Sequence, residues 1–399
     1  MEVLKMGKTV VMGVCGGIAA YKAVYAASAM MKKGIDVHVV MTKSATEFVT
    51  PLTFQTITKN KVITDMFSLS ENVTTEHISL AKAADAFLIC PATANVIGKI
   101  ASGIADDFLT TTVMATKAKV VFAPAMNTNM YENPIVTANI NKLKHLKYEF
   151  VEPADGILAC GDSGRGRLAE IEDILDKIDE VLCDKKDFEG KKVLITAGAT
   201  QEAIDPVRYI TNHSTGKMGY ALAKIAKMRG ANVTLVSGKT NLRPFSGVDV
   251  VNVTSAEDMY NAVMEKYPDT DIVIKAAAVA DFTPEKCESE KIKKTDGEYA
   301  LPLKKTEDIL KKLGALKVNQ ILVGFCMETS NLIENAREKL ENKNLDFIAA
   351  NSLNCEGAGF GTDTNVITLI SKDGGIEPLE KMSKDDVANA ILDRVAEKF

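Results

Sequence analysis

The fold of this chain is constrained most by short apolar runs of strand length. Most of these runs are followed by Gly or Pro and then by a helical pattern. In the first half these runs are Thr9–Val14, Ile35–Met41, Ala86–Cys90 and Val120–Ala123. Their hydrophobicity is continuous rather than alternating, which is typical of strands that are covered on both faces. Such strands with helices between them predict a doubly wound α/β domain with a mostly parallel sheet.

The same plan starts again after a charged segment at Cys183–Gly190 (CDKKDFEG). The strand candidates of the second half are Lys192–Thr196, Val233–Ser237, Val248–Val253, Ile272–Ala276, Ile321–Cys326, Phe347–Ala350 and Val366–Ile370. The chain has 399 residues, enough for two domains at roughly 100–200 residues each. We therefore predict two Rossmann-like three-layer α/β domains, 1–185 and 186–399, with the boundary in the charged segment.

Composition excludes several classes of protein. The net charge of −5, the 6% aromatic content and the absence of Trp argue against a nucleic-acid partner. Every apolar stretch of membrane-spanning length is interrupted by a charge or a loop signal, so we predict a cytoplasmic protein without a membrane partner. The seven Cys lack CxxC spacing and the four His lack an HExxH motif, which favours reduced thiols and argues against a zinc site.

A glycine turn follows the first predicted strand, in the segment GVCGGIAAYK that ends at Lys22. Adjacent glycines and the start of a helix can hold a phosphate, although a tight strand–helix turn explains them equally well. No acidic residue ends the next strand, where Met41-Thr42-Lys43 stands instead. A dinucleotide fold uses an acid there to hold the ribose, so the sequence favours a mononucleotide, with Thr42 as a hydroxyl donor.

Polar residues follow two further strands, at Pro91–Asn95 (PATAN) and Pro124–Asn127 (PAMN). Ligands of open α/β sheets bind at the carboxyl ends of the strands, so the two loops predict one shared pocket. The alternative is that Thr93, Asn95 and Asn127 only cap helices and turns.

A glycine-rich segment, Asp155–Arg167, holds Cys160 beside two Arg and is predicted to be a mobile flap. Neighbouring cations favour the reactive thiolate form of a cysteine, although a single Cys is more often a small apolar residue. Cys90 and Cys326 lie inside apolar strands and are expected in the core. His77 could be a general base, although such a histidine is more often structural. The polar, Lys-rich segment Thr283–Lys305 is expected to be a functional or disordered loop.

Several motifs, in order along the chain, resemble known families. GGIAAYK, HISLAKAAD, CPATANVIGKIASGIADDFLT, PAMN and LACGDSGRGR resemble the homo-oligomeric flavin-containing cysteine decarboxylases. TAGATQEAIDPVRYITNHSTGKMG, KAAAVADF, KIKK and NLDFIAAN resemble phosphopantothenoylcysteine synthetase. Together they resemble the bifunctional coenzyme A biosynthesis family, over nearly the whole chain. That resemblance implies ligation of cysteine to 4′-phosphopantothenate, followed by decarboxylation of the product to 4′-phosphopantetheine.

In the first half, the resemblance implies an FMN-dependent decarboxylase. The residues that match the FMN contacts of the family are Gly16, Gly17, Ile18, Thr42, Pro91, Ala92, Thr93, Asn95, Ser102 and Asp106. His77 matches a catalytic histidine, Asn127 the residue that grips the substrate carboxylate, and Cys160 the proton donor of the flap. Flavin oxidation of the thiol end to a thioaldehyde would create an electron sink for the loss of CO₂.

In the second half, the resemblance implies a ligase that uses CTP and Mg²⁺ through an acyl-cytidylate. Lys291 of KIKK matches the residue that stabilises charge on the attacked phosphate. The residues that match nucleotide or phosphopantothenate contacts are Arg208, Asn212, Ala277, Asp281, Phe325, Lys339 and Lys343. No metal ligand is identified. From spacing alone, Lys339 and Lys343 would be a solvated helix face.

The resemblance also implies an assembly, in which trimeric decarboxylase units are joined by ligase dimers into a dodecamer. Ala199, Gln201 and Thr283 depart from the family pattern, which leaves the choice between CTP and ATP open. Two other readings of the chain are a pyridine-nucleotide oxidoreductase and a nucleotide-binding module without chemistry. The missing acid after the second strand of each half counts against the oxidoreductase.

Overall fold

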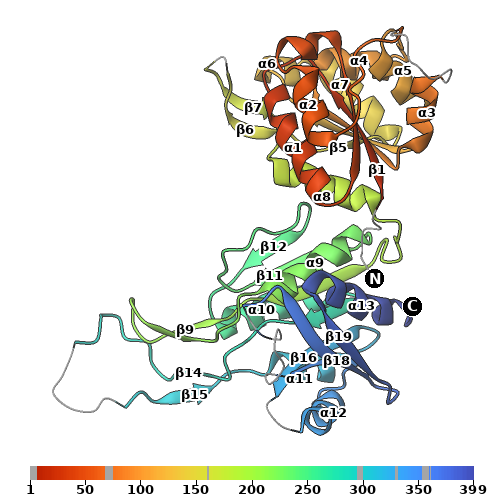
Figure 1. Ribbon diagram of the computed structural model, residues 1–399. Helices are drawn as coiled ribbons and strands as arrows, with labels where there is room; N and C mark the ends of the chain where they lie inside the picture. Colours follow the sequence, from red (N-terminus) through yellow and green to blue (C-terminus); the bar gives the residue numbers. More distant parts are fainter. Residues whose placement is uncertain are drawn as a thin grey trace. The chain divides into compact units, whose positions relative to one another are not determined.

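The computed structural model describes residues 7–67, 75–159, 161–293, 300–328, 331–352, 359 and 361–399. The chain forms two compact units, the first ending at Asp184 and the second beginning at Lys185 (Figure 1). In the described part of the chain, no helix combines the length and the apolar character needed to cross a membrane.

The first unit is built on a five-stranded sheet whose strand order is β2-β1-β3-β4-β5 and in which every pairing is parallel. Its strands are β1 (Thr9–Val14), β2 (Asp36–Met41), β3 (Ala86–Ala92), β4 (Lys119–Pro124) and β5 (Glu149–Phe150). The predicted parallel sheet is therefore confirmed, and β5 is an additional short edge strand.

Alternate residues of the strands pack on opposite faces of this sheet, as the continuous apolar runs require. Val10 and Met12 belong to one core cluster, together with α1 (Ala20–Lys32) and α8 (Ile171–Leu182). Val11 and Phe87 belong to the other. The remaining helices are η1 (Lys43–Glu47), α2 (Pro51–Thr58), α3 (Glu76–Ala83), α4 (Ala94–Ala101), α5 (Phe108–Ala115), α6 (Thr128–Tyr131) and α7 (Pro134–His145).

The segment predicted as a glycine-rich flap contains an antiparallel hairpin, β6 (Ala154–Ile157) with β7 (Ser163–Arg167). Gly156, Gly164 and Gly166 all have positive φ angles there, between 149° and 157°. Side chains at such angles are strained, so the glycines serve the backbone geometry of the hairpin.

The second unit is built on an eight-stranded sheet with the order β12-β11-β8-β13-β16-β17-β18-β19. Its strands are β8 (Lys192–Ala197), β11 (Asn232–Ser237), β12 (Asp249–Asn252), β13 (Ile272–Lys275), β16 (Ile321–Glu328), β17 (Phe347–Ser352), β18 (Thr364–Ser371) and β19 (Ile376–Ser383). The first six strands in that order are parallel and the last two are antiparallel. The sheet is thus mostly parallel, as predicted, with an antiparallel edge.

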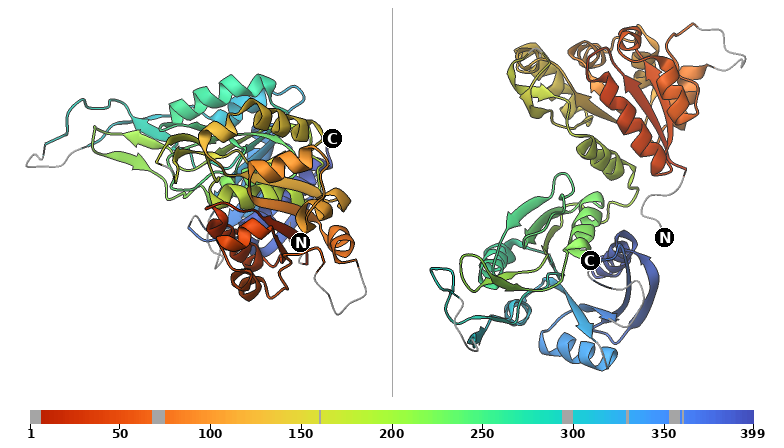
Figure 2. Two further views of the ribbon diagram at one scale, coloured as in Figure 1. Left: turned by 90° about the horizontal axis from the view of Figure 1, so that it is seen from above. Right: turned by 60° about the vertical axis from the view of Figure 1, so that its left-hand side comes forward.

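Three helices, α10 (Ala256–Lys266), α11 (Ile309–Leu316) and α12 (Leu332–Asn342), share one core cluster with the sheet. A short helix, η2 (Tyr267–Asp269), follows α10. The other two helices, α9 (Lys217–Met228) and α13 (Lys384–Ala396), pack against each other (Figure 2).

Two small hairpins extend side by side away from this sheet (Figures 1 and 2). They are β9 (Gln201–Ala203) with β10 (Tyr209–Thr211), and β14 (Phe282–Pro284) with β15 (Leu303–Lys305). β14 contacts β9. The segment predicted to be a functional or disordered loop, Thr283–Lys305, therefore begins and ends in strands, and its residues 294–299 lie outside the described part.

Arg229, just after α9, is the largest fully buried side chain of the second unit. Its guanidinium donates to both carboxylate oxygens of Asp187, at 2.9 and 2.5 Å, and to Asp393 at 2.8 Å. It also lies 4.8 Å above the ring of Phe188. Arg229 thereby joins the first residues of the unit to α13, and a buried arginine requires such partners because its charge is costly to desolvate.

Candidate active sites

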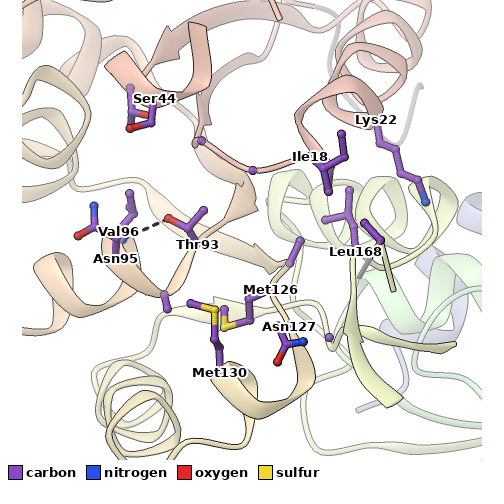
Figure 3. A pocket seen from close by; sticks show the side chains of 18 of the residues that line it. Ile18, Lys22, Ser44, Thr93, Asn95, Val96, Met126, Asn127, Met130 and Leu168 are labelled. Atoms are coloured by element: carbon purple, nitrogen blue, oxygen red, sulfur yellow. Dashed lines mark hydrogen bonds between the residues drawn. The ribbon is translucent and has the colours of Figure 1, made fainter. Parts of the chain in front are cut away.

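The first unit contains a pocket of about 1100 Å³ at the carboxyl ends of β1, β3 and β4 (Figure 3). In the strand order 2-1-3-4-5, the connections change direction between β1 and β3, and open α/β sheets bind ligands at this switch point. Gly16 and Gly17 follow β1, whereas Thr93 and Asn95 follow β3, so the pocket lies where the fold predicts a ligand.

Two threonines in the pocket wall also hold the local backbone. Thr42 Oγ1 accepts a hydrogen bond from Ala45 N at 3.2 Å, and Thr93 Oγ1 accepts one from Val96 N at 3.4 Å. At Thr42 the hydroxyl oxygen accepts, which leaves its O–H group able to donate to a ligand. The Thr93 hydroxyl also forms a hydrogen bond with the buried Cys15 thiol. A threonine at these positions can therefore both cap the local backbone and line a ligand pocket.

The glycines of the pocket differ in how much space a Cβ atom would find at each position. A Cβ on Gly16 would lie 2.3 Å from Ser44 Cβ, and a Cβ on Gly166 would lie 2.3 Å from the Met126 carbonyl oxygen. Both positions therefore require glycine for backbone packing. At Gly17 the nearest such atom is Thr93 Cγ2 at 3.8 Å, so its backbone leaves room for a ligand to approach.

Charged groups of both signs line the pocket. Lys99 Nζ contacts Asp106 at 2.7 Å, and this hydrogen bond lowers the pKa of Asp106. Lys22, Lys43 and Arg167 add further positive charge. Arg167 donates from Nη2 to Glu170 at 2.5 Å, but its buried Nε has no hydrogen-bond partner among the described residues. An anionic ligand would satisfy such a donor.

The structure brings most of the predicted residues of the first half together. The predicted residues that line the pocket are Gly16, Gly17, Ile18, Thr42, Thr93, Asn95, Asp106 and Asn127. Asn127 caps α6 by accepting from Asn129 N at 2.9 Å, and it donates to Asp162 at 3.2 Å.

Four of the predicted residues that the structure describes do not line this pocket. Pro91 and Ala92 are buried at the end of β3, and Ser102 is exposed after α4. His77 lies in the first turn of α3, where its ring meets the edge of Phe108 at a centroid distance of 6.1 Å. Cys160 lies outside the described residues, although Leu158 and Ala159 just before it line the pocket.

A cluster of charges marks the second unit, beside the switch point between β8 and β13. Lys343 Nζ pairs with Asp308 at 2.8 Å. Lys275 ends β13. Burial and the neighbouring Lys343 lower the pKa of Lys275 to about 8, although Asp308 and Asp281 act to raise it. Phe325 lies on the adjacent strand, next to Gly324, which pairs with Lys275. The cluster thus combines two predicted residues, Asp281 and Lys343, with two that the sequence analysis missed.

The missed residues, Lys275 and Asp308, carried only weak sequence signals. Lys275 ends an apolar strand, and such a lysine is usually solvated, so its burial could not be read from the sequence. Asp308 caps α11 by accepting from Lys311 N at 3.1 Å, which explains an aspartate there without a ligand. Asn351 at the end of β17 is a further missed residue, since its buried Oδ1 has no hydrogen-bond partner among the described residues.

Two other predicted residues hold the segment after β13 in place. Asn212 Nδ2 donates to the Ala278 carbonyl oxygen at 3.0 Å, and Ala277 N donates to Thr196 Oγ1 at 3.2 Å. Lys339 lies on α12, one turn before Lys343, and is partly buried.

Arg208 and Lys291 lie elsewhere, on the two hairpins. Arg208 Nη2 donates to the Ile292 carbonyl oxygen at 3.0 Å, which places Arg208 beside the residue that follows Lys291. Lys291 itself is exposed. Within the described ranges, no group of three or more His, Cys, Asp or Glu is placed to hold a metal ion.

The two halves of the chain match two different protein families. Residues 2–183 match the family described as Flavoprotein, and residues 188–399 match the DNA/pantothenate metabolism flavoprotein C-terminal domain. The coenzyme A biosynthesis bifunctional protein CoaBC of Bacillus subtilis (strain 168) is 50% identical over 392 residues, which cover 98% of this chain and 97% of that protein.

The protein of the same name from Borreliella burgdorferi (strain ATCC 35210 / DSM 4680 / CIP 102532 / B31) is 47% identical over 388 residues, which cover 96% of this chain and 98% of that protein. Among solved structures, the C-terminal domain of a coenzyme A biosynthesis bifunctional protein CoaBC is 44% identical. It covers 53% of this chain and 97% of that chain, with a TM-score of 0.47.

The fold, the pocket and the family matches define a two-unit α/β enzyme whose first unit is a flavoprotein domain. The chain belongs to the family of coenzyme A biosynthesis bifunctional proteins. It combines phosphopantothenate–cysteine ligase and phosphopantothenoylcysteine decarboxylase activities, as the resemblance predicted, which sets aside the oxidoreductase and the module without chemistry.

Proposed function

We propose that the flavin of the first unit is FMN and that the ligase of the second unit uses CTP through an acyl-cytidylate. The observation that carries the first part is the pocket at the switch point between β1 and β3, with its open glycine backbone and its unpaired arginine Nε. In this strand order, FMN binds at that place in the fold. We assign the decarboxylase to residues 1–185 and the ligase to residues 186–399.

The residues of the pocket fit the parts of FMN. Gly17 and the cations Lys22 and Arg167 would hold the phosphate, because open backbone and positive charge favour an anion. The flavin ring would pack on apolar side chains such as Ile18 and Met126, which Figure 3 shows on opposite sides of the pocket. When bound, FMN supplies two-electron oxidation at the carbon that carries the substrate thiol.

The protein groups would position the substrate and move one proton. Asn127 would donate its amide N–H to the substrate carboxylate, while the hairpin β6–β7 excludes water from the pocket. Cys160 would donate the proton that the enethiolate takes up after CO₂ leaves. His77 does not line the pocket of its own chain, so we propose that it serves a pocket formed between protomers.

The ligase centre would hold CTP at the cluster on the second sheet. Lys275, Lys339 and Lys343 would neutralise the nucleotide phosphates, and Phe325 and Ala277 would contact the cytidine, since Lys275 and Lys343 belong to this cluster and Phe325 lies on the strand next to Lys275. Asp281 would meet Mg²⁺ that arrives with the phosphates, since Mg²⁺ is commonly held by one or two carboxylates plus substrate phosphates. Lys291 would stabilise charge on the attacked phosphate, and Arg208 and Asn212 would hold phosphopantothenate.

Incubation of the protein with 4′-phosphopantothenate, L-cysteine, FMN and either CTP or ATP tests this proposal. Mass spectrometry should find phosphopantetheine and CMP with CTP, and much less product with ATP. Protein mixed with FMN should retain the flavin absorption band after gel filtration. Phosphopantetheine formed without added or retained FMN would contradict the FMN assignment. Equal yields with CTP and ATP would contradict the CTP assignment.

Assembly is also part of the proposal. We propose trimers of the first unit and dimers of the second unit, joined into a dodecamer, because the partly buried His77 and the projecting hairpins would then meet neighbouring protomers. Light scattering of the purified protein measures the mass directly. A stable monomer that carries both activities would refute this assembly.

Replacing Cys160 with Ser is expected to spare ligation and to stop the decarboxylase reaction after the loss of CO₂ and before the final reduction. Serine is too weak an acid to supply the proton that the thiol supplies. Mass spectrometry of the products should then show a decarboxylated species with two hydrogen atoms fewer than phosphopantetheine. The control is Cys287→Ser, an exposed cysteine of the second unit, which should leave both activities unchanged.

The lowered pKa of Lys275 predicts a pH dependence of the ligase. With a pKa of about 8, Lys275 is mostly charged below that pH and mostly neutral above it. If its charge attracts CTP, kcat/KM for CTP should fall as pH rises through about 8, tending to about tenfold per pH unit. Lys275→Met should be slow at every pH and should lose this fall in kcat/KM. Lys266→Met, at a lysine of α10 whose side chain is 42% exposed, should keep it. A flat wild-type profile between pH 7 and 9.5 would count against the assignment.

A further inference from the structure

Asp205, at the tip of the hairpin β9–β10, is a buried carboxylate that no step of the proposed reaction uses. Only 2% of its surface is exposed, although hairpin tips are usually solvated. The Arg208 side chain donates to it from Nε at 2.9 Å and from Nη2, and these bonds hold the pKa of Asp205 well below its ordinary value. Asp205 is therefore ionised over the whole physiological range.

The two oxygens of this carboxylate have different partners. Oδ1 accepts from the backbone N–H groups of Val207 and Arg208, both at 2.8 Å, which closes the turn of the hairpin. Oδ2 accepts from the Arg208 side chain and from Ile292 N at 3.2 Å. One oxygen thus stabilises its own turn, while the other reaches a segment more than eighty residues further along the chain.

The second segment is the one that carries Lys291. Ile292 N donates to Asp205, and the Ile292 carbonyl oxygen accepts from Arg208 Nη2 at 3.0 Å. In addition, Glu288 N donates to the Ile204 carbonyl oxygen at 3.0 Å. Asp205, Arg208 and the peptide of Ile292 therefore form a closed ring of hydrogen bonds directly beside Lys291.

We propose that Asp205 is a positioning residue of the ligase, which fixes the Lys291 segment and the Arg208 side chain relative to each other. This inference rests on the proposed role of Lys291. A flexible lysine must be ordered before it can stabilise charge, and holding its backbone in advance reduces that cost. The exposure of Lys291 leaves its backbone neighbours as the groups that can hold it.

The test uses Asp205→Asn in the full-length protein. The amide oxygen of the new Asn can accept the two hydrogen bonds that Asp205 Oδ1 accepts. Its NH₂ group, which only donates, then faces the donors of Arg208 and Ile292 that Oδ2 satisfied. We expect kcat for ligation to fall roughly 10- to 100-fold, with KM for CTP little changed. Hydrogen exchange should speed up at Ile292 N and stay slow at Val207 N. Glu377→Gln, which breaks the arginine–carboxylate pair with Arg394, should change none of these.

A double-mutant cycle with Lys291→Gln separates positioning from stability. If Asp205 acts through Lys291, kcat of the double variant at saturating 4′-phosphopantothenate should be no lower than that of Lys291→Gln alone. Additive losses, or normal kcat despite fast exchange at Ile292, would overturn the inference. Normal ligation by Lys291→Gln would instead overturn the proposed role of Lys291. If Asp205→Asn does not fold, Asp205→Glu, which keeps but displaces the carboxylate, is measured in the same way and should lower kcat.

Discussion

The Lys291→Gln protein is expected to lose ligation by roughly 100- to 1000-fold and to decarboxylate supplied phosphopantothenoylcysteine at the normal rate. The loss is large because a positive charge at the attacked phosphate acts mainly in the transition state. The fold should be unaffected, since Lys291 is exposed. Pyrophosphate release from phosphopantothenate, cysteine and CTP measures the first activity, and CO₂ release measures the second.

The matched control is Lys286→Gln on the same segment. Lys286 is exposed and pairs with Glu288 at 3.1 Å, so its replacement removes an equal charge without touching the proposed centre. Ligation by this variant should stay within about twofold of the unmodified protein, because exposed ion pairs contribute little. Equal losses in both lysine variants would show that net charge of the segment, not Lys291, is responsible.

The second large effect concerns stability. Replacing Arg229 with Ala is expected to lower the free energy of unfolding of the second unit by about 3 kcal/mol. The change removes the buried one of the two cations that Asp187 and Asp393 share, since Lys185 also pairs with both carboxylates. It also removes the cation above Phe188. Urea unfolding followed by ligase activity measures the effect, while flavin absorption should report an unchanged first unit.

Arg394→Ala serves as the comparison for Arg229. Its bidentate pair with Glu377 is 40% exposed on both sides, so about 1 kcal/mol or less should be lost. Arg229→Met, which keeps most of the buried volume, should fall between the two. Equal losses of unfolding free energy in Arg229→Ala and Arg394→Ala would show that burial does not make the contribution of Arg229 to stability larger.

The sheets could be predicted because buried parallel strands leave continuous apolar runs. Thr9–Val14 was predicted with the bounds observed, and Phe347–Ala350 was two residues short of β17. β19 was missed since it is an antiparallel edge strand whose side chains are mostly exposed, so its sequence, IEPLEKMS, is largely polar. The hairpin strands are too short to carry a period of their own.

The sites were predictable to different degrees. Gly17, Thr93 and Asn127 follow strand ends, and the topology gathers strand ends at one edge. Lys275 and Asp205 were missed because burial and long-range partners decide their states, and neither is visible in the local sequence. The roles proposed for Cys160 and His77 rest on the resemblance and remain predictions.

The hydrogen bonds of Thr42 and Thr93 lower the entropic cost of binding the flavin. Because their oxygens already accept backbone hydrogen bonds, their rotamers are set before any ligand arrives. Little conformational entropy is then lost on association, which favours slow release. A cofactor retained in this way would stay with the protein through many turnovers, like a prosthetic group rather than an exchanging co-substrate.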